Sequence, residues 1–367
     1  MKHISVALAG ACALASMAAT AANTLHIANN GLDGPGCGTA VAPCRSISAG
    51  LAAAAEGDTI LVRPGLYGDI DGDGALGAPG EETGNYNGTV YINKRVTVLS
   101  TEGAAATFIR GVDSVPIVVY IEVSGVQFGE RGAGFSVTGA NSFGISNNNM
   151  VSGKIAGNIA TGQVVGFYIG SSGNVEVSHN TAIGNSSAGI IGATNSGTTG
   201  GVFIHDNVVV GSANTTGILA SALGAHRVIG NSISGAGIGL QLGVGPTRVS
   251  QNFISGNVQG IAYTEYFGDE VPSGTPVVAR NTLAGNVNNG VYISHLANYP
   301  ISLRQNNFLG NGRGCAIGTS ANIAIDARQS FWGTASGPGG APPSNLVCST
   351  FDVVKTTPFA TTEIAVH

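Results

Sequence analysis

The feature that most constrains this chain is a short asparagine- and glycine-centred motif that recurs through most of its 367 residues. The unit reads apolar-x-x-Asn-x-apolar-x-Gly and is followed, after a few residues, by Gly-apolar-x-apolar. Intervals of roughly 20 to 30 residues between copies are typical of solenoids. A degenerate copy without the asparagine runs from Val123 to Val137. The complete copies are centred on Asn158, Asn180, Asn207, Asn231, Asn252, Asn281 and Asn306.

The motif predicts an all-β, single-stranded parallel β-helix. One unit cannot bury its apolar side alone, whereas stacked units can, because each strand pairs with its equivalent in the next coil. Glycine allows positive φ at the corners, and asparagine tolerates the left-handed region and can hydrogen-bond along its own column. A leucine-rich repeat would need Leu-x-x-Leu-x-Leu runs, and a propeller repeats aromatic motifs, whereas this chain has one tryptophan.

A second asparagine position follows the glycine of the motif, as at Asn257. Several coils fill this corner with other residues, such as Ser212 and Ala236. We therefore expect the column that contains Asn252 to be buried and structural, and Asn257 to be replaceable at lower cost.

Composition agrees with many tight corners that join short strands. Only 10% of the residues are charged, against about 25% in an ordinary globular domain. The chain has 58 glycines, yet 43% of its residues are hydrophobic, which argues against disorder. The formal net charge of −5 makes nucleic acid an unexpected partner.

The first 22 residues have the pattern of a signal peptide. Lys2 and His3 precede an apolar stretch from Ile4 to Ala19, and Ala19-Thr20-Ala21 is a small-x-small cleavage site. A lipoprotein processed at Cys12 is the alternative, with an unusually brief apolar stretch. No segment is long enough for a transmembrane helix. We expect a secreted protein, periplasmic or extracellular, with residues 23–367 forming one domain.

A short helix is expected near the start of this domain. Ser46 can cap a helix that runs through Leu51 to Ala55, and Gly57 can end it. Such a helix would cover the open edge of the first coil, since a solenoid exposes unpaired strands at each end. The expected subdivisions are a cap with the first coil (23–67), a calcium-loop insertion (68–88), the coils (89–333) and a C-terminal cap and tail (334–367).

Four cysteines remain after removal of the leader. Three pairings are possible, and the local pairs Cys37–Cys44 and Cys315–Cys348 are favoured because each lies near one end of the chain. Disulfides fit an exported protein. A zinc site is the alternative, but Cys-x2-Cys spacing and neighbouring histidines are lacking.

The N-terminal segment resembles the cap of the secreted right-handed parallel β-helix proteins, the pectate-lyase-like superfamily. The segments that carry this resemblance are Cys37…Pro43-Cys44 through Leu51, Glu56-Gly57-Asp58 and Pro64-Gly65-Leu66-Tyr67. Phe331-Trp332-Gly333 with Gly337-Pro338 resembles the motif that often ends the repeat array. The resemblance, together with the preference of parallel crossovers, implies right-handed coils. It leaves function open, because lyases, hydrolases, epimerases and non-enzymes share this scaffold.

A calcium loop is expected in the insertion. Asp69, Asp71 and Asp73 alternate as in hard-cation loops, and Gly74 allows a sharp turn. The backbone of Ala75 and the carboxylate of Glu81 complete the expected ligand set. The twelfth position holds Gly80, which departs from an EF-hand, and a solvated Asp-Gly turn is the alternative.

Two sets of residues are candidates for chemistry. The resemblance implies an arginine or lysine base and a cation that neutralises a uronate carboxylate, and Arg227, Arg248 and His205 are candidates that could share a face. The alternative is that these three residues are scattered over the surface and solvated, as Arg280 and Arg304 nearby would be. His179 and Asp206 are interpreted as simple corner residues.

The second set is an aromatic and acidic insertion. Tyrosines there could stack on sugar rings, and carboxylates could accept hydroxyl hydrogen bonds or catalyse hydrolysis. We expect ligand binding by Tyr263, Glu265, Tyr266 and Tyr292, with Glu265 and Asp269 as candidate catalytic carboxylates. A corner loop that packs its own aromatics is the alternative.

The leading hypothesis is a secreted β-helix that binds or processes a polysaccharide. The alternatives are a non-catalytic structural or adhesive protein of the cell envelope, and a polysaccharide lyase.

Overall fold

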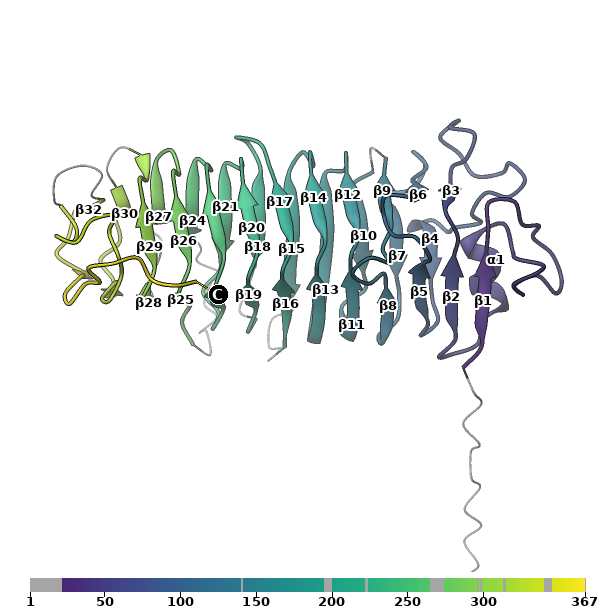
Figure 1. Cartoon of the computed structure of the whole chain (residues 1–367), viewed down its shortest axis with the longest axis horizontal. Coiled ribbons are helices and arrows are strands. Elements are labelled where there is room, and N and C mark those ends of the chain that lie inside the picture. The colour runs from purple at the N-terminus through teal and green to yellow at the C-terminus, as the bar shows by residue number, and fades with distance from the viewer. Residues whose placement is uncertain are drawn as a thin grey trace, which may run out of the picture.

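The computed structural model describes residues 22–139, 141–194, 200–221, 224–264, 274–295, 297, 299–312, 315–339 and 345–366. The chain forms a parallel β-helix whose coils stack along one long axis (Figure 1). The expected leader therefore lies almost wholly outside the described residues. Each coil supplies strands to three rows, here called rows A, B and C, and equivalent strands pair in parallel from coil to coil.

Row A begins at the N-terminal end of the stack. It includes only the second half of β13. Its strands are β1 (Thr24–Ile27), β2 (Thr59–Val62), β5 (Thr97–Ser100), β8 (Val126–Phe128), β11 (Met150–Ala156), β13 (Val165–Ser178), β16 (Gly201–His205), β19 (Arg227–Ile229), β22 (Arg248–Ser250), β25 (Val277–Ala279), β28 (Ile301–Ser302), β31 (Ile325–Asp326) and β33 (Val354–Lys355).

Row B forms a separate ten-stranded sheet within the described residues. Its strands are β3 (Gly65–Gly68), β6 (Thr107–Arg110), β9 (Ser136–Thr138), β12 (Ile159–Thr161), β14 (Thr181–Ile183), β17 (Val208–Val210), β20 (Ser232–Ser234), β23 (Phe253–Ser255), β26 (Thr282–Ala284) and β29 (Asn307–Leu309).

Row C includes the first half of β13, which runs on into row A in the same coil. Its other strands are β4 (Gly88–Ile92), β7 (Ile117–Ile121), β10 (Phe143–Asn147), β15 (Ala188–Thr194), β18 (Thr216–Ala220), β21 (Ile238–Leu242), β24 (Gln259–Tyr263), β27 (Asn289–Ile293), β30 (Cys315–Thr319) and β32 (Leu346–Ser349).

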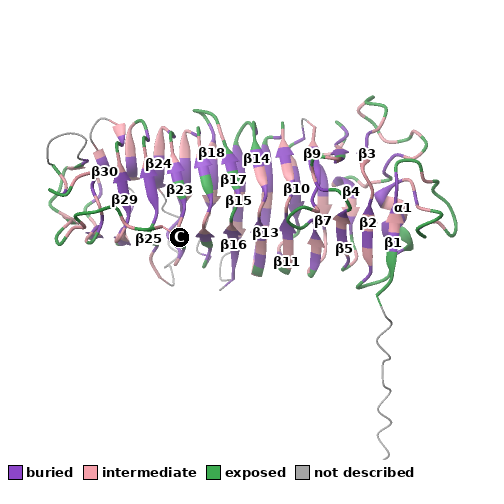
Figure 2. Cartoon of the chain, viewed as in Figure 1, coloured by how far each residue is buried: buried purple, intermediate pink, exposed green. Residues whose placement is uncertain are grey.

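Strand alternation explains why the core is continuous. Alternate side chains point to opposite faces of a strand, so one register position in each row faces inward in every coil. In row C, Val90, Val119 and Ile145 are consecutive partners, and all three are fully buried. Figure 2 shows the buried strand residues along the whole stack, with exposed residues concentrated in the connections. The glycine at the second position of most row C strands is required for packing, because a Cβ at Gly166 would lie 2.8 Å from the carbonyl oxygen of Gly189.

The repeated asparagines form an unbroken ladder at the corner between rows A and B. In each coil the side-chain Oδ1 accepts the backbone N–H of the equivalent asparagine one coil earlier, at 2.8 to 3.0 Å. Each Nδ2 also donates to backbone carbonyls, as Asn252 does to Val228 and Ser250. The ladder runs from Asn158 to Asn306 and ends on the Ser330 hydroxyl.

A second ladder occupies the corner between rows B and C, contrary to the expectation for Asn257. Asn257 is fully buried and bonds to Asn286, which is followed by Asn311 and Asn345. The expectation was wrong because this corner is buried even though some coils fill it with residues other than asparagine. Where Ala236 takes the place of asparagine, its N–H still donates to Asn257 Oδ1 at 3.0 Å.

The residue before each ladder asparagine adopts the left-handed conformation. The interpretation of His179 and Asp206 as corner residues agrees with this, since both have φ of 55°. Gly157 and Gly230 fill the same position with no steric penalty. The other non-glycine residues at this corner are Gln251, Arg280, Gln305 and Gln329, with φ of 57° to 60°.

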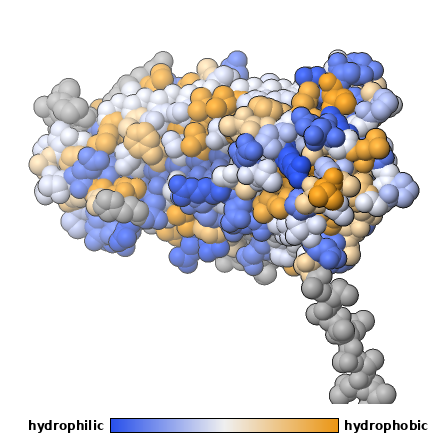
Figure 3. Space-filling model, turned by 45° about the vertical axis from the view of Figure 1, so that its right-hand side comes forward, coloured by the Kyte–Doolittle hydropathy of each residue, from blue (hydrophilic) through white to orange (hydrophobic). Residues whose placement is uncertain are grey.

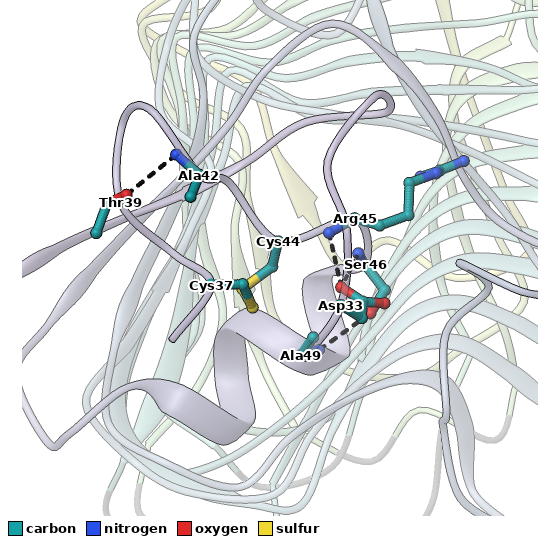
Figure 4. The surroundings of a disulfide bond; sticks show 8 residues. All are labelled: Asp33, Cys37, Thr39, Ala42, Cys44, Arg45, Ser46 and Ala49. Carbon is teal, nitrogen blue, oxygen red and sulfur yellow. Dashed lines mark hydrogen bonds between the residues drawn. A yellow bond between two sulfur atoms is a disulfide. The ribbon is translucent and has the colours of Figure 1, made fainter. Parts of the chain in front are cut away.

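The expected capping helix is confirmed as α1 (Ile47–Ala53). The Ser46 side chain accepts the N–H of Ala49 at 3.1 Å, as Figure 4 shows. The last carbonyls are satisfied by Lys94, whose Nζ lies 2.8 Å from the Leu51 oxygen and 2.7 Å from that of Ala54. The C-terminal end of α1 is therefore tied to the segment between β4 and β5.

Both expected disulfides are present. Cys37–Cys44 closes the loop beside α1 (Figure 4), and Cys315–Cys348 joins β30 to β32. Strands β32 and β33 extend the stack beyond residue 333, where the sequence interpretation placed the start of the cap and tail. The chain then runs back along the stack (Figure 1), held where the Asn307 side chain bonds both the N–H and the C=O of Ile364 at 2.8 Å.

No helix among the residues described here is long and apolar enough to cross a membrane.

A histidine that the sequence analysis did not single out lies in the interior. His226 is fully buried; its Nδ1 accepts the N–H of Val202 at 3.2 Å, and its Nε2 lies 2.9 Å from the Ser221 carbonyl oxygen. These partners select the neutral tautomer with the proton on Nε2. Burial lowers the pKa of His226 to about 4, although the bond to Ser221 acts in the opposite direction.

We predict that Asn252→Leu and Asn257→Leu both lower the free energy of unfolding, each by about 1–3 kcal/mol, because each strands buried backbone groups. Urea unfolding monitored by circular dichroism measures the loss. Asn214→Leu, at an exposed position, is the matched control and should stay within about 0.5 kcal/mol of the parent. An Asn257 variant as stable as the Asn214 control would show that the second ladder is dispensable.

We predict that His226 destabilises the protein in acid. The folded pKa lies below the unfolded value of about 6.5, so the unfolded chain binds a proton that the folded chain rejects. The contribution is complete above about pH 6.5 and is lost as pH falls towards about 4; between about pH 7.5 and about pH 5 it amounts to about 2 kcal/mol. Denaturant unfolding at the two pH values should show the drop, and His226→Leu should abolish that component. Exposed His295→Asn is the control, and a drop in the His226→Leu variant equal to that of the parent would assign the effect elsewhere.

Candidate functional site

The expected aromatic and acidic insertion is only partly described. Glu265, Tyr266 and Asp269 lie outside the described residues. For Tyr263 the expectation is wrong, because its side chain is fully buried in the core. Tyr263 pairs in register with Leu242 and Ile293, both of which point inward, so strand alternation directs the tyrosine inward as well. Burial raises its pKa to about 12.

Tyr292 lies one register position earlier, at the outward-facing position of row C, and is partly exposed. The same position holds Tyr91, Tyr120 and Tyr168 in β4, β7 and β13. We call these four residues the tyrosine column. Sequence reasoning missed all but Tyr292, although a signal was present: Val90-Tyr91-Ile92 and Val119-Tyr120-Ile121 recur as Phe-Tyr-Ile at 167–169 and Val-Tyr-Ile at 291–293.

The N-terminal half of the tyrosine column takes part in two aromatic pairs, with Ser146 at the register position between Tyr120 and Tyr168. The rings of Tyr91 and Tyr120 are stacked in adjacent coils with centroids 6.1 Å apart and planes 12° apart. Two coils on, Tyr168 contacts Phe143, whose ring centroid is 5.1 Å away. Beside Tyr91 lies a pocket of about 200 Å³, lined in part by Ser48, Thr83 and Asn93. Stacked rings next to hydroxyl and amide groups are suited to sugars, which present apolar faces and polar edges.

The surroundings of Tyr91 and Tyr120 disfavour ionisation of their hydroxyls. Burial raises the pKa of Tyr120 to about 12, and its hydrogen bond to the negatively charged Glu122 acts in the same direction. Burial also raises the pKa of Tyr91, with a smaller contribution from Glu122. The hydroxyls therefore remain protonated in neutral solution and can donate as well as accept hydrogen bonds.

The basic candidates lie together on the outer side of row A. Phe203, Arg227 and Arg248 are register partners in consecutive coils, so Arg227 and Arg248 share a face as expected. The Arg227 guanidinium lies over the Phe203 ring, 4.0 Å from its centroid. Both arginines are exposed and make no ion pair within 4.0 Å to any residue that the structure describes.

His205 connects this face to two carboxylates. Its Nδ1 lies 2.7 Å from Asp206 Oδ2 and its Nε2 lies 3.4 Å from Glu176 Oε1, while Lys154 Nζ is 3.7 Å from the same Glu176 oxygen. Partial burial alone would raise the pKa of Glu176, but the Ser178 hydrogen bond and the charges of Lys154 and His205 outweigh it and lower the pKa. Glu176 is therefore ionised at neutral pH and serves as a hydrogen-bond acceptor rather than a general acid. Of the other arginines near this face, Arg304 lies 3.8 Å from Asp326 and Arg280 occupies a corner.

The acidic loop brings together three of the expected metal ligands. Carboxylate oxygens of Asp69, Asp71 and Glu81 lie within 4.8 Å of one another. Asp73 does not belong to this group; its Oδ1 instead accepts the N–H of Ala75 at 2.8 Å. The site is thus smaller than the sequence pattern indicated. Oxygens spaced this closely fit one hard cation with ligands at about 2.3–2.6 Å.

The insertion is also tied to the capping helix. Glu81 accepts the N–H groups of Ile70, Gly77 and Ala78 at 2.8 to 3.1 Å. Although desolvation acts to raise its pKa, these bonds outweigh it, and the pKa of Glu81 is lowered. The next residue, Glu82, accepts the N–H groups of Ile47 and Ser48 at the start of α1. Order in the acidic loop is therefore coupled to order in the N-terminal cap.

Comparisons with known proteins agree on the architecture. A model of the right-handed β-helix region matches residues 166–329. No curated protein sequence matches the chain. Three similar solved structures are XylC with xylose (13% identity, 84% of this chain and 75% of that chain, TM-score 0.53), an alginate lyase from Paenibacillus sp. str. FPU-7 (12%, 91% and 99%, 0.51), and the A-module of a mannuronan C-5 epimerase from Azotobacter vinelandii (15%, 87% and 95%, 0.51).

These similarities show the fold. The chain is a right-handed parallel β-helix, and the expected fold class is confirmed.

We propose that Asp69, Asp71 and Glu81 bind Ca²⁺ and that the ion stabilises the insertion. An ion that binds only the folded state raises the free energy of unfolding, by about 3 kcal/mol at a hundred times its dissociation constant. Thermal unfolding in EDTA and in CaCl₂ should therefore show a higher melting temperature with calcium. Asp71→Asn should remove that shift, whereas exposed Asp352→Asn should retain it. Equal melting temperatures in EDTA and calcium would refute the site.

Proposed function

We propose that this protein binds a polysaccharide along the outer side of row C. The observation that carries the proposal is the tyrosine column: Tyr91, Tyr120, Tyr168 and Tyr292 occupy one register position of the stack. Parallel strands repeat every ~4.8 Å, so the chain offers a regular, outward-facing track along its long axis. A polysaccharide is a polymer of repeating rings, so successive rings can contact successive positions along this face.

The aromatic surface supplies contact area, and the groups beside it supply hydrogen bonds. Sugar C–H faces pack against the rings of Tyr91, Tyr120 and Tyr168, while tyrosine hydroxyls and the Glu122 carboxylate reach sugar hydroxyls. The pocket of about 200 Å³ beside Tyr91 is placed to hold one end of the bound segment. Tyr292 would contact a longer chain in the C-terminal half.

Two features support an extracellular setting for this binding. The leader pattern of residues 1–22 predicts export, and the two disulfides fit an oxidising compartment. The similar structures include proteins named for alginate and mannuronan chemistry and one bound to xylose. A polysaccharide ligand is consistent with those names.

A polysaccharide lyase is the second candidate, favoured by the row A face. There Arg227 and Arg248 could neutralise a uronate carboxylate, and His205, held between Asp206 and Glu176, could move a proton. This face lies on a different row from the tyrosine column, so binding and cleavage would occur at separate sites. A lyase generates an unsaturated product that absorbs in the ultraviolet; a binding protein does not.

We predict that Tyr120→Ala lowers affinity about fivefold or more for any glycan found on an array of the mature protein, because stacking on a partly buried ring contributes on the order of 1 kcal/mol. Isothermal titration calorimetry measures the change. Phe253→Ala, an exposed aromatic on row B, is the matched control and should bind normally. Binding that survives Tyr91→Ala combined with Tyr120→Ala would move the site away from row C.

Incubation with alginate and polygalacturonate, followed by ultraviolet absorbance, tests the lyase directly. Absorbance that rises with time and is lost in His205→Ala would establish cleavage at the row A face. No rise with either polymer leaves binding as the function.

A further inference from the structure

We infer that the polysaccharide bound along row C is electrically neutral, an inference that rests on the proposed function and names its ligand class. The first observation is the composition of the column itself. Consecutive register partners from β4 to β30 carry tyrosine, serine, aliphatic, glutamine or glycine side chains and no charge. They are Tyr91, Tyr120, Ser146, Tyr168, Ile191, Leu219, Gln241, Ala262, Tyr292 and Gly318.

The neighbouring column, where the row C strands begin, is also uncharged. Its polar members, Thr216, Gln259 and Asn289, lie in the C-terminal half of the stack. Their hydroxyl and amide groups can form hydrogen bonds with sugar hydroxyls without an ionic partner. Its members are Ile117, Phe143, Val165, Ala188, Thr216, Ile238, Gln259 and Asn289.

Charges that flank the tyrosine column disfavour an anionic polymer. Glu122 follows β7 directly, accepts a hydrogen bond from Asn148 Nδ2 at 3.1 Å, and is close enough to raise the pKa of Tyr120. A carboxylate at this point repels uronate or sulfate groups and accepts bonds from neutral hydroxyls.

The cations nearest the first tyrosine are already engaged. Lys94 lines the pocket beside Tyr91, but its ammonium donates to the carbonyls of Leu51, Ala52 and Ala54 at the end of α1. Arg95 lies 3.6 Å from Glu56. Four arginines that the structure describes are exposed and make no ion pair, and none of them lies on a row C strand: Arg227 and Arg248 belong to row A, and Arg131 and Arg280 follow row A strands. An acidic chain on row C would therefore lose hydration of its charges without gaining a cation.

On the face that Figure 3 shows, hydrophilic and hydrophobic residues alternate in small patches. The strands of row C carry no charged side chain, whereas row A carries the ion pairs of Lys154, Glu176 and His205 and that of Asp326.

Matched polymers test the inference, because they share a backbone and differ in charge. The probes are hydroxyethylcellulose against carboxymethylcellulose, and methyl-esterified homogalacturonan against polygalacturonate, with xylan, galactomannan and alginate added for breadth. Affinity electrophoresis of the whole mature protein should show at least one neutral polymer bound at least about tenfold more tightly than its acidic counterpart. Binding should change little between about 0.05 M and about 0.5 M salt, since no charge pairing is involved.

A designed cation provides the positive test. Ile191→Lys places an ammonium next to Tyr168 in the outward column and should increase binding to the acidic member of each pair, whereas Ile191→Gln should not. The opposite result is tighter binding of an acidic polymer by the unmodified protein, with binding that Tyr120→Ala and salt both weaken. That result would overturn the inference of a neutral ligand but keep the binding site on row C. Binding to any of these polymers that Tyr120→Ala leaves unchanged, or binding to none, would overturn the proposed function as well.

Discussion

The hydrogen bonds between stacked asparagines are the constraint on which the rest of this structure depends. Each ladder asparagine accepts a backbone N–H of the coil before it, and its side-chain amide donates to carbonyls, as Asn252 does to Val228 of the preceding coil and to Ser250 at its own corner. A coil can therefore neither rotate nor slip without stranding buried polar groups. Two such ladders run through the stack, one on each side of row B. Together they hold successive coils in a constant register.

Constant register turns single residues into columns, and strand alternation decides which way each column points. Tyr263 and Tyr292 belong to the same row, yet one lies in the core and the other faces outward, because they occupy register positions of opposite parity. The inward positions of row C are filled mainly by valine, leucine and isoleucine and belong to the core. The four tyrosines at outward positions are partly exposed, so they are less committed to packing than Tyr263.

The few charges of the chain are distributed unevenly among the rows. Row A carries the Lys154–Glu176–His205 cluster and the arginine pair, whereas the outward positions of row C carry none. The acidic loop lies at the N-terminal end, where two adjacent glutamates have different contacts. Glu81 accepts N–H groups within the loop, and Glu82 accepts N–H groups of α1. An uncharged row C, a charged face on row A and an acidic loop are thus separate parts of one scaffold.

Sequence alone determined the fold, because a motif that repeats with glycine corners and a buried asparagine has few ways other than stacking to satisfy its backbone. The capping helix at Ser46 and both disulfides followed from local signals of the same kind. Local signals did not predict the burial of Asn257 or of Tyr263. Whether a corner is buried, or a tyrosine points in or out, depends on the partner strand one coil away, some 20 to 30 residues distant in sequence. The tyrosine column likewise required the register between coils, since its four members are separated by long and unequal intervals and meet only when the stack aligns them.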